Sequence, residues 1–171
     1  MKQSYYQRSK LETPEINKKL FLLMEEKKSN LALSCDLTSA AAVLRITEQI
    51  GDKICLLKTH IDILEDFQIE FIEKLKKLAA QKKFLLFEDR KFGDIGNTVS
   101  KQYGAGIYKI SSWADFTNAS ALPGYGLVEG LHQEAKKYII AGMPRGLLLW
   151  AQITSANNYA DERYLKNCLS L

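Results

Sequence analysis

The segment Phe84-Leu-Leu-Phe-Glu-Asp-Arg-Lys-Phe-Gly-Asp-Ile-Gly-Asn-Thr-Val-Ser-Lys-Gln-Tyr103 contains both halves of a pattern that is repeated along the chain. Its first residues, from Phe84 to Glu88, are mostly apolar and predict a short buried strand. The stretch from Ile95 to Tyr103 has helical spacing and predicts a helix. The segment therefore reads as one strand followed by one helix.

The same alternation continues on both sides of this segment. The apolar runs predict strands at 31–35, 54–58, 84–88, 106–110 and 147–153, and the helical candidates lie at 39–50, 67–82, 95–103, 127–138 and 159–168. Because parallel neighbours need a crossover, which is usually a helix, the pattern predicts an α/β fold with a parallel sheet. A doubly wound sheet and a (β/α) barrel both fit, although no clean Gly-x-Gly-x-x-Gly follows a strand.

One domain over residues 1–171 is expected, with a lead-in of about 30 residues before the first unit. Within the lead-in, 13–28 predicts an amphipathic helix, because Pro14 suits a first helical turn and the apolar residues have helical spacing. Five βα units then occupy 31–171. Eight units of this size would need about 250 residues, the usual size of a closed barrel, so this chain is expected to form an incomplete one.

Polar residues end each of the first three predicted strands. They are Ser34 and Asp36, Lys58 and His60, and Asp89 and Lys91. The members of each pair are two residues apart and so share one face of their strand. Ionisable residues at the carboxyl ends of successive parallel strands are typical of a barrel active site. The alternative is that these charges simply leave the sheet for solvent.

The pattern Asp89-x-Lys91-x-x-Asp94, with Lys58 from the neighbouring strand, predicts an array of two ammonium and two carboxylate groups. Opposite charges a few ångströms apart favour the charged forms, so the lysines are expected to stay protonated. A cationic lysine is suited to stabilising negative charge and delivering a proton. The array therefore predicts stabilisation of a carbanion, and a structural ion-pair network is the alternative.

Other chemistries fit these residues less well. Ser34, Asp36 and His60 lack the glycine context of a hydrolase nucleophile elbow. Glu88 and Asp89 are consecutive in a strand and point to opposite faces, so they do not form a glycosidase pair. Metal binding by Asp36 or Asp89 is an open alternative, although Lys58 and Lys91 would already neutralise those carboxylates.

The composition indicates an ordinary globular chain, with 46% hydrophobic and 26% charged residues among 171. Lys plus Arg (24) exceeds Asp plus Glu (20) by only four, and the basic residues are spread along the chain, so nucleic acid is not an expected partner. The longest uncharged stretch, 146–160, contains several polar residues and is too short to span a bilayer. The three cysteines are odd in number and lack zinc-site spacing. No secretory signal is recognised, and we expect a cytoplasmic location.

At the array residues the sequence resembles the orotidine 5′-phosphate decarboxylase family, in the group found in eukaryotes and some bacteria. The motifs that carry the resemblance are Leu57-Lys-Thr-His-Ile-Asp62, Phe87-Glu-Asp-Arg-Lys-Phe92, Asp94-Ile-Gly-Asn-Thr98, Tyr108-Lys-Ile110 and Ser112-Trp-Ala-Asp115. They occur in the family's order, and one residue departs from its pattern, Gly93 in place of alanine. The resemblance implies a (β/α)₈ barrel and a homodimer with shared active sites. It also implies cofactor-free conversion of orotidine 5′-monophosphate to uridine 5′-monophosphate and CO₂, in pyrimidine synthesis.

The resemblance also implies roles for individual residues. Lys91 would donate a proton to C6, Asp89 would lie near the scissile carboxylate, Lys58 would complete the array, and Asp94 would reach the partner's site. The residues implied to bind substrate are Ser34, Asp36, Lys58, His60 and Asp89 near the ribose and array, Ile95 and Thr98 from the partner chain, and Ser155 at the pyrimidine.

Three interpretations follow for the chain as given. The first is the decarboxylase or a fragment of it, although the family's phosphate-gripping loop and arginine would lie in the part that is not present. The second is a metal-dependent decarboxylase of a sugar-acid phosphate, because related proteins share the Asp-x-Lys-x-x-Asp pattern. The third is a non-catalytic fragment that binds a nucleotide weakly or only dimerises.

Overall fold

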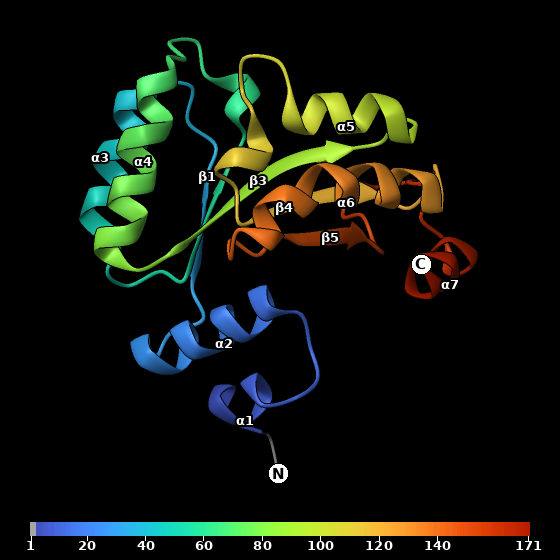
Figure 1. Ribbon diagram of the computed structural model, residues 1–171, viewed down its shortest axis with the longest axis horizontal. Helices are drawn as coiled ribbons and strands as arrows, with labels where there is room; N and C mark the ends of the chain where they lie inside the picture. The colour runs from blue at the N-terminus through green and yellow to red at the C-terminus, as the bar shows by residue number, and fades with distance from the viewer. Residues whose placement is uncertain (1–2) are drawn as a thin grey trace.

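The computed structural model describes residues 3–171 and contains one parallel sheet of five strands (Figure 1). The strands are β1 (Ala32–Cys35), β2 (Leu56–Thr59), β3 (Leu85–Phe92), β4 (Phe116–Ser120) and β5 (Gly146–Trp150). Their order in the sheet is their order in the chain, so each new strand pairs with the preceding one. This confirms the predicted α/β fold with parallel strands. It also leaves β1 and β5 as the two edges of the sheet.

Helices connect the strands and also precede the sheet. They are α1 (Tyr5–Ser9), α2 (Glu15–Lys27), α3 (Ala40–Ile50), α4 (Ile69–Lys82), α5 (Gly96–Gly104), α6 (Tyr125–Ile140) and α7 (Glu162–Ser170), with two 3₁₀ turns, η1 (Ile61–Ile63) and η2 (Ile110–Ser112). Helices α3 and α4 lie together beside one half of the sheet, and α5 and α6 lie together beside the other half (Figure 1). In residues 3–171, no helix is both long and apolar enough to cross a membrane.

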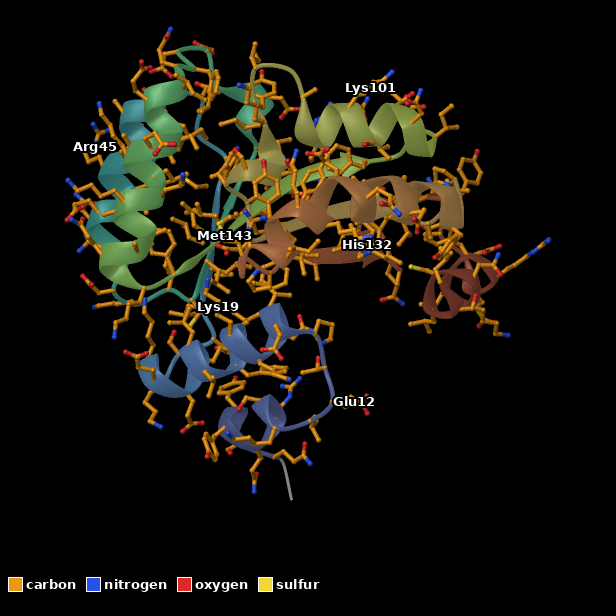
Figure 2. All side chains as sticks on the ribbon, in the orientation of Figure 1. Glu12, Lys19, Arg45, Lys101, His132 and Met143 are labelled. Atoms are coloured by element: carbon orange, nitrogen blue, oxygen red, sulfur yellow. The ribbon has the colours of Figure 1, made fainter. Side chains whose placement is uncertain are left out.

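The larger hydrophobic core lies between the sheet and helices α3–α6. Leu57 of β2, Leu75 of α4, Val99 of α5 and Leu127 of α6 are almost completely buried in it. The opposite faces of these helices carry charged residues such as Arg45 and Lys101, which are exposed (Figure 2). The helical spacing seen in the sequence thus corresponds to one apolar face on each helix.

A second, smaller core lies at the amino-terminal ends of the strands. Ile16 and Leu23 of α2 pack there with Cys55, Leu85 and Phe116. Helix α2 therefore covers the end of the sheet opposite to the polar strand ends, which confirms the predicted lead-in helix.

Lys27 fixes this helix to the rest of the chain. Its Nζ donates to the carbonyl oxygens of Gly51, Ile54 and Lys82, at 2.8, 2.7 and 2.7 Å. These oxygens lie at the ends of α3 and α4 and just before β2. Partial burial lowers the pKa of Lys27, while the three carbonyls supply acceptors for its three N–H groups.

The predicted strand at 106–110 is wrong. Gly106 and Lys109 have φ values of 67° and 43°, which bend the chain into turns, and Ile110 begins η2. The apolar residues of this stretch serve as anchors instead, because Ile110 is fully buried. The fourth strand is β4 (Phe116–Ser120), whose sequence Phe-Thr-Asn-Ala-Ser lacks the apolar run that signals a buried strand.

Candidate active site

The carboxylate of Asp89, at the carboxyl end of β3, is the centre of a hydrogen-bonded cluster. Lys58 Nζ donates to Asp89 Oδ2 at 2.8 Å, and Lys91 Nζ donates to Asp89 Oδ1 at 2.5 Å. Asn118 Nδ2, from β4, donates to the same Oδ1 at 2.6 Å. One buried carboxylate thus accepts three hydrogen bonds, two of them from ammonium groups.

Residues of β1 and β2 extend this cluster. His60 Nε2 lies 3.0 Å from Lys58 Nζ, and Asp36 Oδ1 lies 3.6 Å from that same ammonium nitrogen. Ser34 Oγ donates to Asp36 Oδ1 at 3.1 Å. All six polar strand-end residues expected from the sequence are therefore brought together. With Asn118 they form the strand-end network: Ser34, Asp36, Lys58, His60, Asp89, Lys91 and Asn118.

The network keeps Asp89 ionised although this side chain is buried. Burial alone would raise the pKa of Asp89, but the hydrogen bonds from Lys58, Lys91 and Asn118 outweigh it and lower the pKa to about 2. The side chain of Lys91 remains 42% exposed, so its ammonium is accessible to a molecule from solvent. An anion beside Lys91 would meet a positive charge that Asp89 holds in place.

Strand β3 is irregular where it carries these residues. Glu88 pairs with Thr117 and Phe92 pairs with Ala119, so three residues of β3 lie opposite Asn118 alone. Lys91, inside this bulge, has φ of 56°, a left-handed conformation that costs a non-glycine residue on the order of 1 kcal/mol. Lys91 Nζ contacts Asp89 Oδ1 within this bulge, where the regular alternation of the strand is interrupted.

Glu88 points to the helix-covered side of the sheet, as alternation along the strand predicts. Its Oε2 accepts from Thr59 Oγ1 at 2.7 Å, and its Oε1 accepts from the Ile61 amide at 2.8 Å. Burial raises the pKa of Glu88 to about 8. Glu88 therefore joins β3 to the end of β2, through Thr59 and Ile61.

A family model matches residues 29–170, and its description is "Orotidine 5'-phosphate decarboxylase / HUMPS family". This chain belongs to that family. The match covers every strand of the sheet and every residue of the strand-end network. The sequence motifs had indicated the same family.

Similar proteins in fungi carry the same name. This chain is 46% identical over 169 residues to the orotidine 5′-phosphate decarboxylase of Candida glabrata and 45% identical over 171 residues to that of Saccharomyces cerevisiae. These alignments include 98% and 99% of this chain, but 63% of each relative. The chain thus spans less than two thirds of the length of the curated relatives that it matches.

Solved structures of decarboxylases have the same fold. The orotidine 5′-monophosphate decarboxylase of Methanocaldococcus jannaschii matches with a TM-score of 0.67 at 19% identity, over 81% of this chain and 63% of that protein. A Streptomyces avermitilis protein described as a putative orotidine 5′-phosphate decarboxylase matches with a TM-score of 0.61 at 21% identity, over 85% of this chain and 56% of that protein. The five-stranded sheet is therefore part of the barrel of this decarboxylase family.

The remaining candidate residues lie outside the strand-end network. Asp94 and Ile95 are exposed between β3 and α5, and Asp94 Oδ1 accepts from the Ile95 amide at 2.7 Å. Thr98 is half-buried on α5. Ser155 is exposed in the loop after β5, where its carbonyl oxygen accepts from Asn158 Nδ2. Their implied roles in the decarboxylase family remain predictions.

Two residues at the strand-end network were not expected from the sequence. Asn118 was overlooked because its strand was not recognised. Trp150 ends β5, and its ring centre lies 5.6 Å from Lys91 Nζ, within range of a cation–π contact. Trp150 lies in the middle of the predicted strand at 147–153 and was taken as one of its apolar residues, whereas the observed strand ends there.

No group of three or more His, Cys, Asp or Glu residues is placed to hold a metal ion within residues 3–171. The carboxylates of the strand-end network have lysine or histidine side chains as neighbours instead.

Proposed function

We propose that this chain carries the catalytic array of an orotidine 5′-monophosphate decarboxylase, which forms uridine 5′-monophosphate and CO₂ without a cofactor. The observation that carries the proposal is the single carboxylate of Asp89 between the ammonium groups of Lys58 and Lys91. Membership of the decarboxylase family supports the same reaction.

Decarboxylation breaks the bond between C6 of the pyrimidine and its carboxylate, and the electron pair stays on C6. The carbanion is stabilised when a positive charge lies beside it, and Lys91 is the accessible ammonium of the network. At an effective dielectric constant of about 20, unit charges about 4 Å apart interact by about 4 kcal/mol. This corresponds to about three decades in rate. Lys91 then transfers a proton to C6 and regains one from solvent.

Asp89 has two roles in this proposal. It orients both lysines. Its negative charge also lies close to the carboxylate of the substrate, and the repulsion between the two charges is relieved when that carboxylate leaves as CO₂. Asp36 and Lys58, with Ser34 and His60 beside them, are proposed to bind the ribose hydroxyls. Ser155 is proposed to hydrogen-bond the pyrimidine.

Asp94, Ile95 and Thr98 are proposed to complete the site of a second copy of the chain. Ile95 is 67% exposed, and Tyr125, at the start of α6, is 64% exposed. The two lie near each other, because the adjacent glycines Gly96 and Gly126 are in backbone contact. Exposed apolar residues next to an active-site segment support a homodimer with shared sites.

The test uses the 171-residue chain and a chimaera that continues it with the uncovered part of the Candida glabrata relative. Each is given orotidine 5′-monophosphate or, in a separate assay, a sugar-acid phosphate. Both assays are run with and without a chelator, and product and CO₂ are measured. We expect turnover by the chimaera and a loss of at least about 10³-fold in its Lys91→Ala variant.

The outcomes separate the three interpretations. Turnover that depends on Lys91 and survives the chelator supports the cofactor-free decarboxylase. Activity on a sugar-acid phosphate that the chelator removes would favour the metal-dependent relative. A chimaera that folds and binds the nucleotide without any turnover would identify a non-catalytic protein and contradict the proposal.

A further inference from the structure

Asn118 occupies the one position of β4 that lies opposite the bulge of β3. Asn118 is 4% exposed, and its side chain faces the carboxylate of Asp89. Asn118 Oδ1 accepts from the backbone amide of Lys91 at 2.7 Å, and Asn118 Nδ2 donates to Asp89 Oδ1 at 2.6 Å. One amide group thus contacts both residues on which the proposed chemistry depends.

The orientation of this amide is fixed by its partners. A backbone N–H can only donate, so it must face the oxygen of Asn118, and an ionised carboxylate can only accept, so it must face the nitrogen. An asparagine satisfies both partners at once. An aspartate at this position would keep the acceptor for Lys91 but would lose the donor to Asp89.

The bulge explains why a side chain is needed here. Three residues of β3 lie opposite Asn118, so the regular ladder does not supply a backbone acceptor for the Lys91 amide. A partly buried N–H without an acceptor is costly, and Lys91 is also in the unfavourable left-handed region. Asn118 Oδ1 takes the place of the missing backbone carbonyl and stabilises that conformation.

We propose that Asn118 is a positioning residue, which holds the left-handed backbone of Lys91 and the carboxylate of Asp89 so that the Lys91 ammonium faces the substrate. The effect on catalysis rests on the proposed function. The effect on Lys91 and Asp89 does not, and it is measurable in the 171-residue chain without substrate.

The first readout is amide hydrogen exchange at Lys91, followed by NMR. Asn118→Ala removes the acceptor, so exchange of the Lys91 amide should accelerate at least about tenfold, while amides of the helix-covered core stay protected. The second readout is the ¹³C shift of the Asp89 carboxyl during an acid titration. Loss of the Asn118 donor should raise the pKa of Asp89 by about one unit.

Thr117→Val is the matched control. Thr117 neighbours Asn118 on β4, is equally buried, and its Oγ1 donates to the carbonyl oxygen of Glu88 on the other side of the sheet. This variant loses a buried hydrogen bond of the same strand without touching Asp89 or Lys91. It should leave both readouts unchanged.

Asn118→Asp separates the two halves of the bridge and serves if the alanine variant does not fold. It retains an acceptor for the Lys91 amide, so that amide should stay protected. Its second carboxyl group next to Asp89 should raise an acid pKa of the pair more than the alanine change does.

Unchanged exchange at Lys91 and unchanged titration of Asp89 in both Asn118 variants would overturn the proposal. Equal changes in Thr117→Val would also overturn it, because they would show a general loosening of β4. If the NMR changes occur while the unaltered chimaera shows no turnover, the positioning role stands and the proposed reaction fails. With turnover, Asn118→Ala should lower kcat at least about tenfold and change KM less.

Discussion

Two neighbouring parts of the molecule differ in the surroundings of one aspartate each, which is buried and hydrogen-bonded in one part and exposed in the other. In the strand-end network, Asp89 is buried and accepts hydrogen bonds from three side chains of the same chain. A few residues later, in the exposed segment 94–98, Asp94 contacts solvent and the amide of its own neighbour. The network is therefore organised by the sheet itself. The exposed segment has its position set by the backbone of α5, and its side chains are free to contact another molecule.

The largest expected difference concerns the two aspartates. Asp89→Ala leaves two ammonium groups and the Asn118 amide without their shared partner, so the free energy of unfolding should fall by about 3 kcal/mol. Asp94→Ala removes an exposed carboxylate and should change it by less than about 0.5 kcal/mol. Urea denaturation at pH 7 measures both. Equal losses would show that the two parts do not differ as described.

The second expected effect is a pH dependence of the free energy of unfolding, caused by the buried carboxyl group of Glu88. Its pKa is about 8 in the folded chain and about 4.5 when unfolded, so the folded state binds the extra proton between these values. This contribution is fully present below pH 4.5 and is lost as the pH rises through 8. The slope is at most about 1.4 kcal/mol per pH unit.

Glu88→Gln tests this effect because glutamine keeps the shape and does not titrate. Its oxygen can accept from the Ile61 amide, and its nitrogen can donate to Thr59 Oγ1. Urea denaturation at pH 5, 6, 7 and 8 should show a smaller fall in stability for Glu88→Gln than for the unaltered chain. Parallel curves would mean that Glu88 titrates near its ordinary value.

The third prediction concerns the close contact between α5, which begins in the exposed segment, and α6. A Cβ on Gly96 would lie 2.3 Å from the carbonyl oxygen of Gly126, and one on Gly130 would lie 2.3 Å from that of Gly96. Gly96→Ala must push α5 away from α6 and should cost about 2 kcal/mol. Thermal unfolding measures the loss.

Gly93→Ala is the matched control for that change. The nearest atom to a Cβ at Gly93 is 3.9 Å away, and alanine is the residue that the family resemblance leads us to expect there. Its melting temperature should stay within about 2 °C of the unaltered chain. If both alanines were tolerated, close packing of the two helices would not be what holds the exposed segment in place.

The smallest expected effect is that of Ser155→Ala. Ser155 is exposed, and the hydrogen bond from Asn158 goes to its backbone carbonyl, which alanine retains. Stability should change by less than about 0.5 kcal/mol. A weaker affinity for uridine 5′-monophosphate, measured by calorimetry on the chimaera, would support contact with the pyrimidine. An unchanged affinity would remove Ser155 from the proposed site.

Much of this organisation follows from the sequence. The network residues of β1, β2 and β3 were predicted because an apolar run followed by charges two residues apart defines both a strand and a shared face. The fourth strand was not predicted, because its polar residues are buried by their neighbours in the sheet and not by their own hydrophobicity. Thr117 and Asn118 are hydrogen-bonded to β3, and a contact between strands distant in sequence has no local signature.

The backbone conformation of Lys91 could not be predicted from the sequence either. Its pair with Asp89 was expected from a regular strand, in which residues two apart share a face. The structure instead reaches the contact through a bulge, with Lys91 in a left-handed conformation. A glycine at this position would have indicated a left-handed conformation, whereas a lysine gives no such indication.

The order of the strands has a consequence for the making of the protein. Each strand pairs with the one synthesised just before it, so every addition finds its partner already present. Bacterial and eukaryotic ribosomes add about 5–20 residues per second, and domains begin to fold during synthesis. The last contributor to the strand-end network is Asn118, which follows Asp89 by 29 residues. The charged cluster can therefore assemble on the nascent chain within seconds of the synthesis of β3, before β5 has left the ribosome.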